Sequence, residues 1–308
     1  MTSRAAWLAT LVVLGCTAAA VAGCGLGAGP SSPGTATLTV TRDYGSKTML
    51  MATEADPPSS QTVLRFLDGR ADITTRYGGG FVQSIDGLAG MSRKDWFFYV
   101  DGTESPVGAA QVDVRGGDRI WWDYRDWSAA MTVPAVVGSW PEPFAQASSG
   151  APRPVVVQCL DVAAACRVAK DRLREAGVSA GLTRKRPAEG SLRLLVGTWD
   201  DVGSDPAVDE LREPGVFATF KMPGRPGGHG HLVGLDQGGT PARDLGGGAG
   251  LVAAVGRPPT WIVTGSRRAA VIRAAKLLKE RYLRNRYAVA APRGRSVPLP
   301  IMRPGGAS

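Results

Sequence analysis

The stretch "KDWFFYVDGTESPVGAAQVDVRGGDRIWWDYRDW", residues 94–127, contains four Trp, two Phe and two Tyr. Both of its ends read as strands, in which alternate side chains point to opposite faces of a sheet. Trp96 and Phe98 share one face, and Phe97 and Tyr99 share the other. Two explanations stay open. The aromatic rings fill the core of a small β-domain, or some of them lie on a surface and hold a flat ligand.

The residues around this stretch predict a domain over 37–127 with one short helix and five or six strands. The helix is expected in "SSQTVLRFLDGR", with Ser59 or Ser60 as its N-cap and Gly69 as its stop. Gly-containing turns separate the strands, among them Asp101-Gly102, which suits a hairpin. We therefore expect an α+β domain of the β-grasp kind. Because one helix covers only one face of the sheet, some aromatics must be exposed or covered by another part of the chain.

Short motifs in this domain keep a distinctive order and spacing. They are Thr62-Val63-Leu64, Gly80-Phe81-Val82, Ile85-Asp86-Gly87, Trp96 followed by "FYVDG", Gly108-Ala109, and Gly117-Asp118 before "IWWDY". This pattern resembles the transcobalamin-like C-terminal domain family, over less than a third of the chain. In animal cobalamin carriers the similar domain closes over a corrinoid held against a helical barrel, which this chain lacks. Some bacterial relatives accompany vitamin transporters of the energy-coupling-factor type. The resemblance implies binding of a ligand or a surface without naming the ligand.

We predict that the ligand-binding residues are aromatic rings with exposed edges near the turns, namely Trp96, Trp122, Tyr124 and Trp127. Residues 37–127 carry 10 Lys and Arg against 13 Asp and Glu, a net charge of −3. Flat ring faces, and not positive charge, would therefore provide the affinity. A corrinoid is the ligand that the resemblance suggests, and no other cofactor is expected. The alternative is that these rings are core and interdomain packing.

The N-terminus predicts an export signal. Arg4 precedes an uncharged segment that ends in "VAGC", Val21 to Cys24. This ending resembles the lipobox of bacterial lipoproteins, in which the Cys is acylated and becomes the mature N-terminus. We expect residues 1–24 to be a signal peptide, Cys24 to carry the lipid and residues 25–36 to be a flexible tether. Cys16 follows a poorer box, and an ordinary secretory signal is the alternative. The expected location is the extracytoplasmic face of the cell membrane.

The second half of the chain predicts a separate α/β domain over residues 154–292. Strand-like and helix-like segments alternate there, which favours a partly parallel sheet. A Pro- and Ser-rich linker is expected over 128–153, a long helix over 266–287 and a disordered tail over 293–308. The expected fold class is thus α+β, with a small β-grasp-like domain followed by an α/β domain.

Two cysteines of this domain, Cys159 and Cys166, are an even pair in an oxidising compartment. On a single helix they would be about 10 Å apart along the axis, too far for a bond. A strand before Cys159 and a helix after Asp161 would bring them within reach. We therefore predict a disulfide, with two buried free thiols as the alternative.

Residues 151–308 carry 25 basic against 13 acidic groups, a net charge of +12. The basic face of the helix expected over 266–287 is either a solvated surface or a contact for anionic lipids or envelope polymers. Nucleic acid is excluded by export. His229 and His231 read as loop residues and not as metal ligands.

The sequence shows no nucleophile–base spacing and no phosphate loop. The predicted function is therefore a non-catalytic, lipid-anchored protein that binds a small ligand or an envelope component, with a vitamin transporter as one partner. The alternative is a structural or interaction lipoprotein without a small-molecule ligand.

Overall fold

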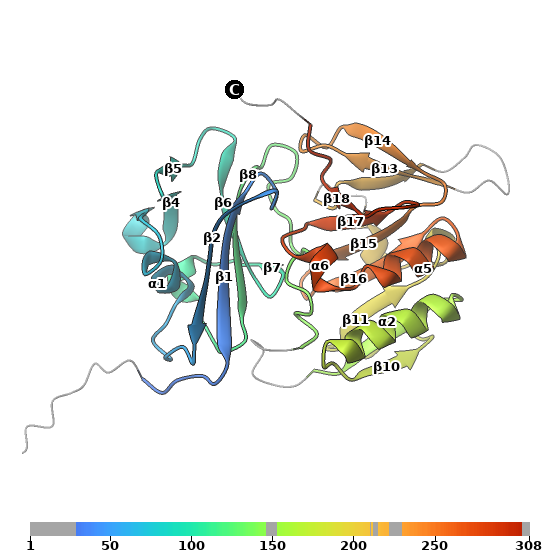
Figure 1. Cartoon of the computed structure of the whole chain (residues 1–308), viewed down its shortest axis with the longest axis horizontal. Helices are drawn as coiled ribbons and strands as arrows, with labels where there is room; N and C mark the ends of the chain where they lie inside the picture. The colour runs from blue at the N-terminus through green and yellow to red at the C-terminus, as the bar shows by residue number, and fades with distance from the viewer. Residues whose placement is uncertain (1–28, 146–152, 210, 212–214, 222–229, 304–308) are drawn as a thin grey trace, which may run out of the picture.

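The structure, a computed structural model, describes residues 29–145, 153–209, 211, 215–221 and 230–303 (Figure 1). It is a mixed α+β protein in which strands dominate and the helices are few and mostly short. Two groups of sheets lie side by side, one built from residues before 127 and the other from residues after 154. None of the helices in these ranges has both the length and the apolar character that a membrane crossing requires.

The first domain contains a five-stranded and a three-stranded sheet. Its elements are β1 (Thr35–Arg42), β2 (Lys47–Ala55), α1 (Val63–Asp68), β3 (Ile73–Arg76), β4 (Phe81–Ile85), β5 (Leu88–Ala89), β6 (Lys94–Val100), β7 (Thr103–Glu104) and β8 (Arg119–Asp126). The larger sheet has the strand order β2-β1-β8-β6-β7, in which β1 and β8 are parallel and the other pairs are antiparallel. The smaller sheet has the order β3-β4-β5.

Helix α1 and the smaller sheet cover one face of the larger sheet. The predicted N-cap, Ser59 or Ser60, is wrong, because the helix begins later, at Val63. The side chain of Thr62 accepts a hydrogen bond from the N–H of Arg65 and caps it. Val63, Phe66 and Leu67 are three or four residues apart, so they share one face of the helix, and all three are buried. They pack against alternate residues of β1, β6 and β8 in a single apolar core.

The second domain is built on a seven-stranded sheet. Its elements are β9 (Val155–Cys159), α2 (Ala163–Glu175), β10 (Ala180–Thr183), β11 (Leu192–Val196), α3 (Trp199–Val202), α4 (Pro206–Asp209), β12 (Ala218–Lys221), β13 (His231–Leu235), β14 (Pro241–Gly246), β15 (Gly250–Val255), β16 (Thr260–Gly265), α5 (Arg268–Lys276), α6 (Glu280–Leu283), β17 (Ala288–Ala291) and β18 (Val297–Leu299). The order of the large sheet is β10-β9-β11-β16-β15-β17-β18, and a small sheet has the order β12-β13-β14. Strands β10, β9, β11 and β16 are parallel, whereas β15, β17 and β18 are joined antiparallel.

Helices α2 and α5 pack next to each other against one face of this sheet. The buried residues of α2 include Ala165, Ala169 and Leu173, which recur at the spacing of one helix face. Every residue of β11 is buried, as expected for a central strand with both faces covered. The sheet is therefore partly parallel, in agreement with the alternation of segments in the sequence.

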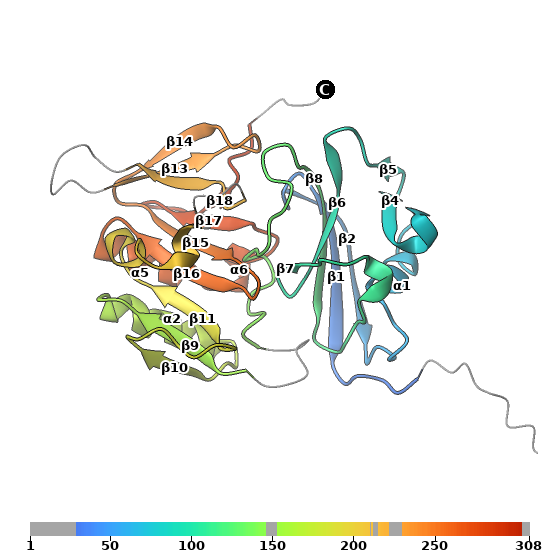
Figure 2. The ribbon, with the colours of Figure 1, turned by 180° about the vertical axis from the view of Figure 1, so that it is seen from behind.

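The two domains share an apolar cluster. The face of the first sheet that is opposite α1 contributes Tyr99 and Trp121, and the second domain contributes Phe217 and Tyr287 among others. Figure 2 shows, from behind, the first sheet lying between α1 and the second domain. One face of this sheet thus belongs to the core of its own domain, and the other belongs to the contact between domains.

The prediction of a linker over residues 128–153 is wrong for the part of this segment that the structure describes. Val136 donates its N–H to the carbonyl of Gly102 at 2.8 Å, and Trp140 and Phe144 are buried. The ring centroids of Trp140 and Phe144 lie 5.6 and 5.3 Å from that of Trp261. Pro and Ser give the segment a loop-like composition. Its scattered apolar residues nevertheless fill space beside and between the domains, which keeps the segment in place.

The prediction of a single helix over 266–287 is also wrong, because the chain forms two helices there, α5 and α6. Lys279 is extended at the start of α6, with φ −150°. On one continuous helix Leu278 and Leu283 would point about 140° apart. The break lets both side chains enter the same apolar core, in which they are 1% and 0% exposed.

The described parts of the predicted tether and of the predicted disordered tail are paired with other segments. Val297–Leu299 forms β18 on the edge of the large sheet, and Ile301 donates its N–H to the carbonyl of Leu235 at 2.7 Å. At the other end, within the predicted tether, Ser32 donates its N–H to the carbonyl of Pro57 at 2.9 Å. Cys24, the signal peptide and residues 25–28 and 304–308 lie outside the described residues.

Candidate functional site

Three of the four aromatic residues predicted to have exposed edges are buried. Trp96, Trp122 and Tyr124 are 5%, 2% and 4% exposed and belong to the core under α1 and the smaller sheet. Trp96 Nε1 donates to the carbonyl of Leu88, and the Tyr124 hydroxyl donates to the carbonyl of Ala89, each at 2.9 Å. The predicted exposure is therefore wrong for these three, because β5 covers the polar ends of Trp96 and Tyr124, and Trp122 stacks on Phe98 in the same core.

Trp127 is half-buried and follows the last residue of β8. Its N–H donates to the carbonyl of Arg93 at 2.9 Å, which continues the pairing of the strands. Alone among the four, this ring keeps part of its surface accessible.

The opposite face of β6 and β8 carries the aromatics that contact the second domain. The ring centroids of Tyr99 and Trp121 are 5.4 Å apart, and that of Tyr287 lies 5.3 Å from Trp121 in an edge-to-face arrangement. Tyr44, in the turn after β1, has its ring centroid 5.1 Å from those of Phe217 and Tyr287. This part of the aromatic cluster is the apolar centre of the junction between the domains.

A buried carboxylate lies inside this junction. Asp123 is 0% exposed, and its Oδ1 accepts hydrogen bonds from the Thr41 hydroxyl at 2.7 Å and from the Gly45 N–H at 3.0 Å. Its Oδ2 accepts from the Tyr287 hydroxyl of the second domain at 2.9 Å. Burial raises the pKa of Asp123 to about 6, although the three hydrogen bonds favour the charged form. The carboxylate holds the turn after β1 and the second domain in place together.

Arg125 fixes the segment that follows β8. Its guanidinium donates to the carbonyls of Ala130 at 2.5 Å and Met131 at 3.0 Å, and it lies 3.8 Å from the ring centroid of Phe97. These hydrogen bonds satisfy the two Nη atoms of a side chain that is 1% exposed, whereas its buried Nε has no hydrogen-bond partner. The guanidinium therefore turns residues 130–131 back against the sheet, into the space between the domains.

Beside this buried contact the domains leave a groove, called here the junction groove. It consists of a cavity of about 580 Å³ and an adjoining smaller one of about 110 Å³, which share Glu280, Arg284 and Asn285. The larger cavity is also lined by Gly45, Ser46, Thr48, Arg281 and Arg286, and the smaller one by Thr37, Thr39, Met51, Arg119, Ile120, Trp121, Gly138 and Ser139. The groove is thus built from the outer strands of the first sheet and from the chain around α6.

The two ends of the junction groove differ in chemistry. Met51 and the edge of Trp121 make the narrow end partly apolar, and Met51 is 57% exposed. The wide end has Arg281, Arg284 and Arg286. A molecule in this groove would therefore meet an apolar wall at one end and guanidinium groups at the other.

Glu280 neutralises part of this positive charge. Its carboxylate pairs with Arg119 at 3.2 Å and with Arg284 at 2.5 Å. Arg281 lies 4.7 Å from the ring centroid of Tyr282, and Arg286 donates to the carbonyl of Gly45 at 3.3 Å. Burial lowers the pKa of Arg286. The wide end therefore retains a net positive charge that suits an anionic group.

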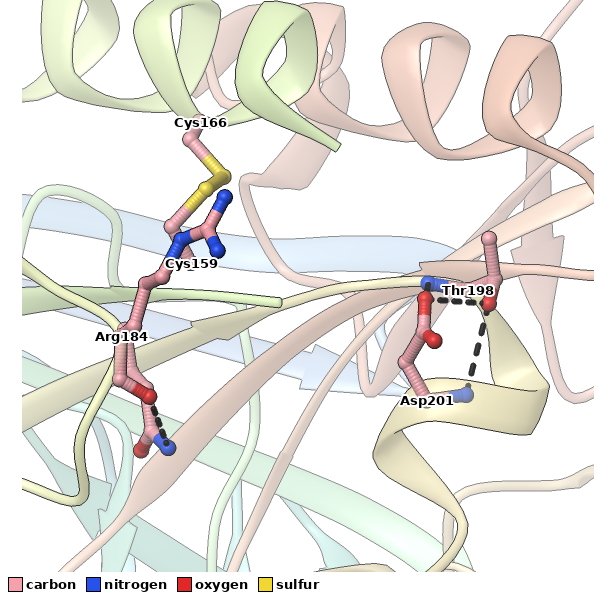
Figure 3. Close-up of a disulfide and its surroundings, with 6 residues drawn as sticks. Cys159, Cys166, Arg184, Thr198 and Asp201 are labelled. Carbon is pink, nitrogen blue, oxygen red and sulfur yellow. Dashed lines mark hydrogen bonds between the residues drawn. A yellow bond between two sulfur atoms is a disulfide. The ribbon is translucent and has the colours of Figure 1, made fainter. Parts of the chain in front are cut away.

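The predicted disulfide is present. Cys159 at the end of β9 is bonded to Cys166 in α2, with Cα atoms 5.7 Å apart, as Figure 3 shows. At the end of neighbouring β11, Thr198 and Asp201 form a capping box at the start of α3. The bond ties a central strand to the helix that covers it.

The described residues contain no cluster of three or more His, Cys, Asp or Glu side chains placed to hold a metal ion. His231 Nδ1 lies 3.2 Å from Asp244 Oδ2, and both side chains are exposed. His229 lies outside the described residues.

Sequence reasoning did not find the junction groove. The alternation of side chains shows that Trp121 and Trp122 face opposite sides of the sheet, but it does not show which side is covered. The sequence prediction therefore names Trp122 and not Trp121. The basic residues between 280 and 286 are predicted to lie on one helix. In the structure Arg286 donates a hydrogen bond to the carbonyl of Gly45, which is about 240 positions earlier in the chain. The excess of basic residues after residue 266 is the one sequence signal that pointed toward this region.

Comparison with known proteins adds a family match to the first domain. Residues 60–126 match the model of a family described as a domain of unknown function, DUF4430. A solved structure of a proposed metal binding protein from Ruminococcus gnavus ATCC 29149 is similar at 15% identity and a TM-score of 0.25, covering 30% of this chain and 97% of that chain. No curated protein matches the chain. The region from α1 to β8 is therefore similar to a family of unknown function.

Proposed function

We propose that this chain is a non-catalytic lipoprotein of the extracytoplasmic membrane face that binds a small ligand in the junction groove. The observation that carries the proposal is the groove itself, a cavity of about 580 Å³ at the contact of two domains. Ligand sites commonly have about 300–1,000 Å³ and commonly lie at such contacts. Its apolar end and cationic end suit an anionic ligand that also has a flat or apolar part.

The resemblance to transcobalamin-like domains supports a β-grasp description of the first domain. A strand order in which β1 and β8 run parallel, with a helix on one face, is compatible with it. The match to the family of unknown function covers the same residues. A corrinoid remains a ligand to be tested, because it combines a flat ring with a phosphodiester. The binding residues proposed for it are now those of the junction groove, because Trp96, Trp122 and Tyr124 are buried.

A second function, that of a structural or interaction lipoprotein of the envelope, is favoured by a different observation. The aromatic residues that might have held a ligand pack the two domains together or fill a core. Such use of aromatics needs no small molecule. The basic region after residue 266 would then contact anionic envelope material, and a vitamin transporter would not be a partner.

Binding to residues 25–308 tests the two functions against each other. The probes are cyanocobalamin, flavin mononucleotide and folate, which are flat molecules with anionic groups. We expect saturable binding of at least one, weakened about fivefold or more by Arg281→Ser or Met51→Asp. Both side chains are exposed, so the fold should be retained. Lys170→Ser, an exposed site on α2, is the control. Absence of saturable binding, or equal affinity of all variants, would favour the structural function.

Anchoring is tested separately with Cys24→Ser. Acylation at the lipobox requires the thiol, so the variant should incorporate no labelled palmitate and should remain uncleaved at this site. Equal labelling of the variant and the natural sequence would contradict the assignment of Cys24.

A further inference from the structure

A further cavity of about 380 Å³ lies between α5 and the connection from β17 to β18. Arg273 and Lys276 reach it from α5, and Arg295 reaches it from the connection. Leu277 and Tyr282 give it an apolar wall. Helix α5 contacts β17, so these segments, distant in sequence, are held side by side. The arrangement is called here the cationic pocket.

The basic residues of the cationic pocket differ from their neighbours in having no acidic partners. Close by, Arg268 pairs with Asp161, Arg284 with Glu280, and Lys279 with Glu175. In contrast, no carboxylate oxygen of the described residues lies within 4.0 Å of a side-chain nitrogen of Arg273, Lys276, Arg293 or Arg295. Among the described residues, the local positive charge is therefore left without a carboxylate partner.

Arg293, which does not line the cavity itself, brings a further guanidinium group near that of Arg273. A methyl group placed on Gly248 would lie 3.6 Å from Arg273 Nη2 and 3.9 Å from Arg293 Nε, so both atoms are close to the same point. Arg273 Nη2 donates to the carbonyl of Gly248, whereas its Nε is buried without a hydrogen-bond partner. Burial and the charge of Arg293 both lower the pKa of Arg273. Like charges held together in this way are stabilised when an anion binds between them.

We propose that the cationic pocket binds a phosphoryl group carried by a phosphate ester. A phosphate monoester has close to two negative charges and several acceptor oxygens, which guanidinium groups bind in a forked geometry. The volume exceeds what a phosphate group alone needs, and Leu277 and Tyr282 offer a surface to the organic part. The site goes beyond the proposed function, because it shares no lining residue with the junction groove.

The phosphoryl group has two sources, a soluble phosphate or the headgroup of an anionic lipid. The experiment uses residues 25–308 with inorganic phosphate in calorimetry, and with phosphatidylglycerol vesicles against phosphatidylcholine vesicles in sedimentation. The test variant is Arg293→Ser with Arg295→Ser, both exposed residues. The matched control is Arg167→Ser with Lys170→Ser, which removes the same charge from the exposed face of α2.

We expect the pocket variant to weaken binding about tenfold or more and the control to leave it nearly unchanged. Saturable phosphate binding with this pattern supports a site for soluble phosphates. The same pattern with phosphatidylglycerol vesicles alone supports a headgroup site. Equal losses in both variants would show that only surface charge acts, and absence of binding to either probe would likewise overturn the proposal. The outcome is independent of Met51→Asp, which tests the junction groove from the first domain.

Discussion

Trp121 and Trp122 are adjacent in sequence but lie in different cores. Trp122 stacks on Phe98 with ring centroids 4.8 Å apart, on the side of the sheet that α1 covers. Trp121 donates its Nε1–H to the Thr41 hydroxyl at 2.7 Å and packs in the junction. A single strand therefore joins the two halves of the molecule, because alternate residues serve alternate faces.

Replacing Trp122 with Ala should lower the free energy of unfolding by about 3–5 kcal/mol, because it leaves a large cavity in a close-packed core. Replacing the half-buried Trp127 should cost less than about 1 kcal/mol. Denaturant unfolding of residues 25–308 measures both. Similar stability of the two variants would contradict the assignment of Trp122 to the core.

Asp118 gives the first domain an unusual pH dependence. The carboxyl group is 1% exposed, and its Oδ1 has no hydrogen-bond partner. Burial, and next the charge of Asp101, raise its pKa to about 7, and burial raises that of Asp123 to about 6. At pH values between the ordinary pKa and the raised pKa of these two carboxyl groups, the folded state binds more protons than the unfolded state. Their contribution to the free energy of unfolding therefore grows as pH falls from 8 toward 5.

The melting temperature should accordingly rise as pH falls from 8 to about 5. Asp118→Asn removes the charge and keeps the oxygen that accepts from the Arg115 N–H at 2.8 Å. The variant should therefore melt at least as high as the natural sequence at pH 8 and show a flatter pH profile. A natural protein that is more stable at pH 8 than at pH 6, or an unchanged profile in the variant, would contradict the raised pKa values.

At the scale of elements, the disulfide and the split helix both serve the core beside α2 and α5. Cys159 and Cys166 belong to the same apolar cluster as Leu278 and Leu283. The bond fixes the start of α2 on the end of β9. The break before α6 lets its following chain turn back toward the first domain, where Asn285 donates its N–H to the carbonyl of Gly138 at 3.2 Å. The disulfide and the break between α5 and α6 thus position the elements that form the junction.

Replacing both cysteines with Ser should lower the free energy of unfolding by about 2–3 kcal/mol, since the closed loop is short. Mass spectrometry of the unreduced, alkylated natural protein should find neither thiol modified. Two alkylated thiols in exported protein, or a double variant of unchanged stability, would contradict the bond.

At the scale of the whole molecule, the two domains depend on each other. The junction cluster contains large rings from both domains, and Asp123 accepts a hydrogen bond from Tyr287 of the second. A contact with a buried polar network of this kind resembles a core more than a transient interface. The two domains should therefore fold together as one cooperative unit.

A fragment of residues 29–127 should consequently fold poorly. It would expose Tyr99 and Trp121 and would leave Arg125 without the carbonyls of Ala130 and Met131. We expect it to bind a hydrophobic dye and to melt without a cooperative transition, whereas residues 29–303 melt cooperatively. A cooperative transition of the fragment near that of the longer chain would show that the domains are independent.

Local patterns in the sequence were enough for the secondary structure of the first domain and for the disulfide. The alternation around Trp96 and Trp122, the stop of α1 at Gly69 and the strand–helix change between Cys159 and Cys166 act over a few residues, so they can be read without the fold. The boundary after residue 127 was drawn at Pro and Ser, and it missed the buried Trp140 and Phe144. Composition indicates a loop but does not show whether that loop packs.

The tertiary structure alone decided which aromatic face is covered, and with it where a ligand has room. Both faces of β6 and β8 are rich in aromatics, so periodicity separates Trp121 from Trp122 but cannot tell what lies opposite each. The answer depends on the second domain, which covers one face and leaves the junction groove beside it. The cationic pocket has the same origin, because α5 and the connection after β17 meet only through the order of strands in the sheet. Burial and charge compensation are properties of contacts between distant residues, and only folding brings those residues together.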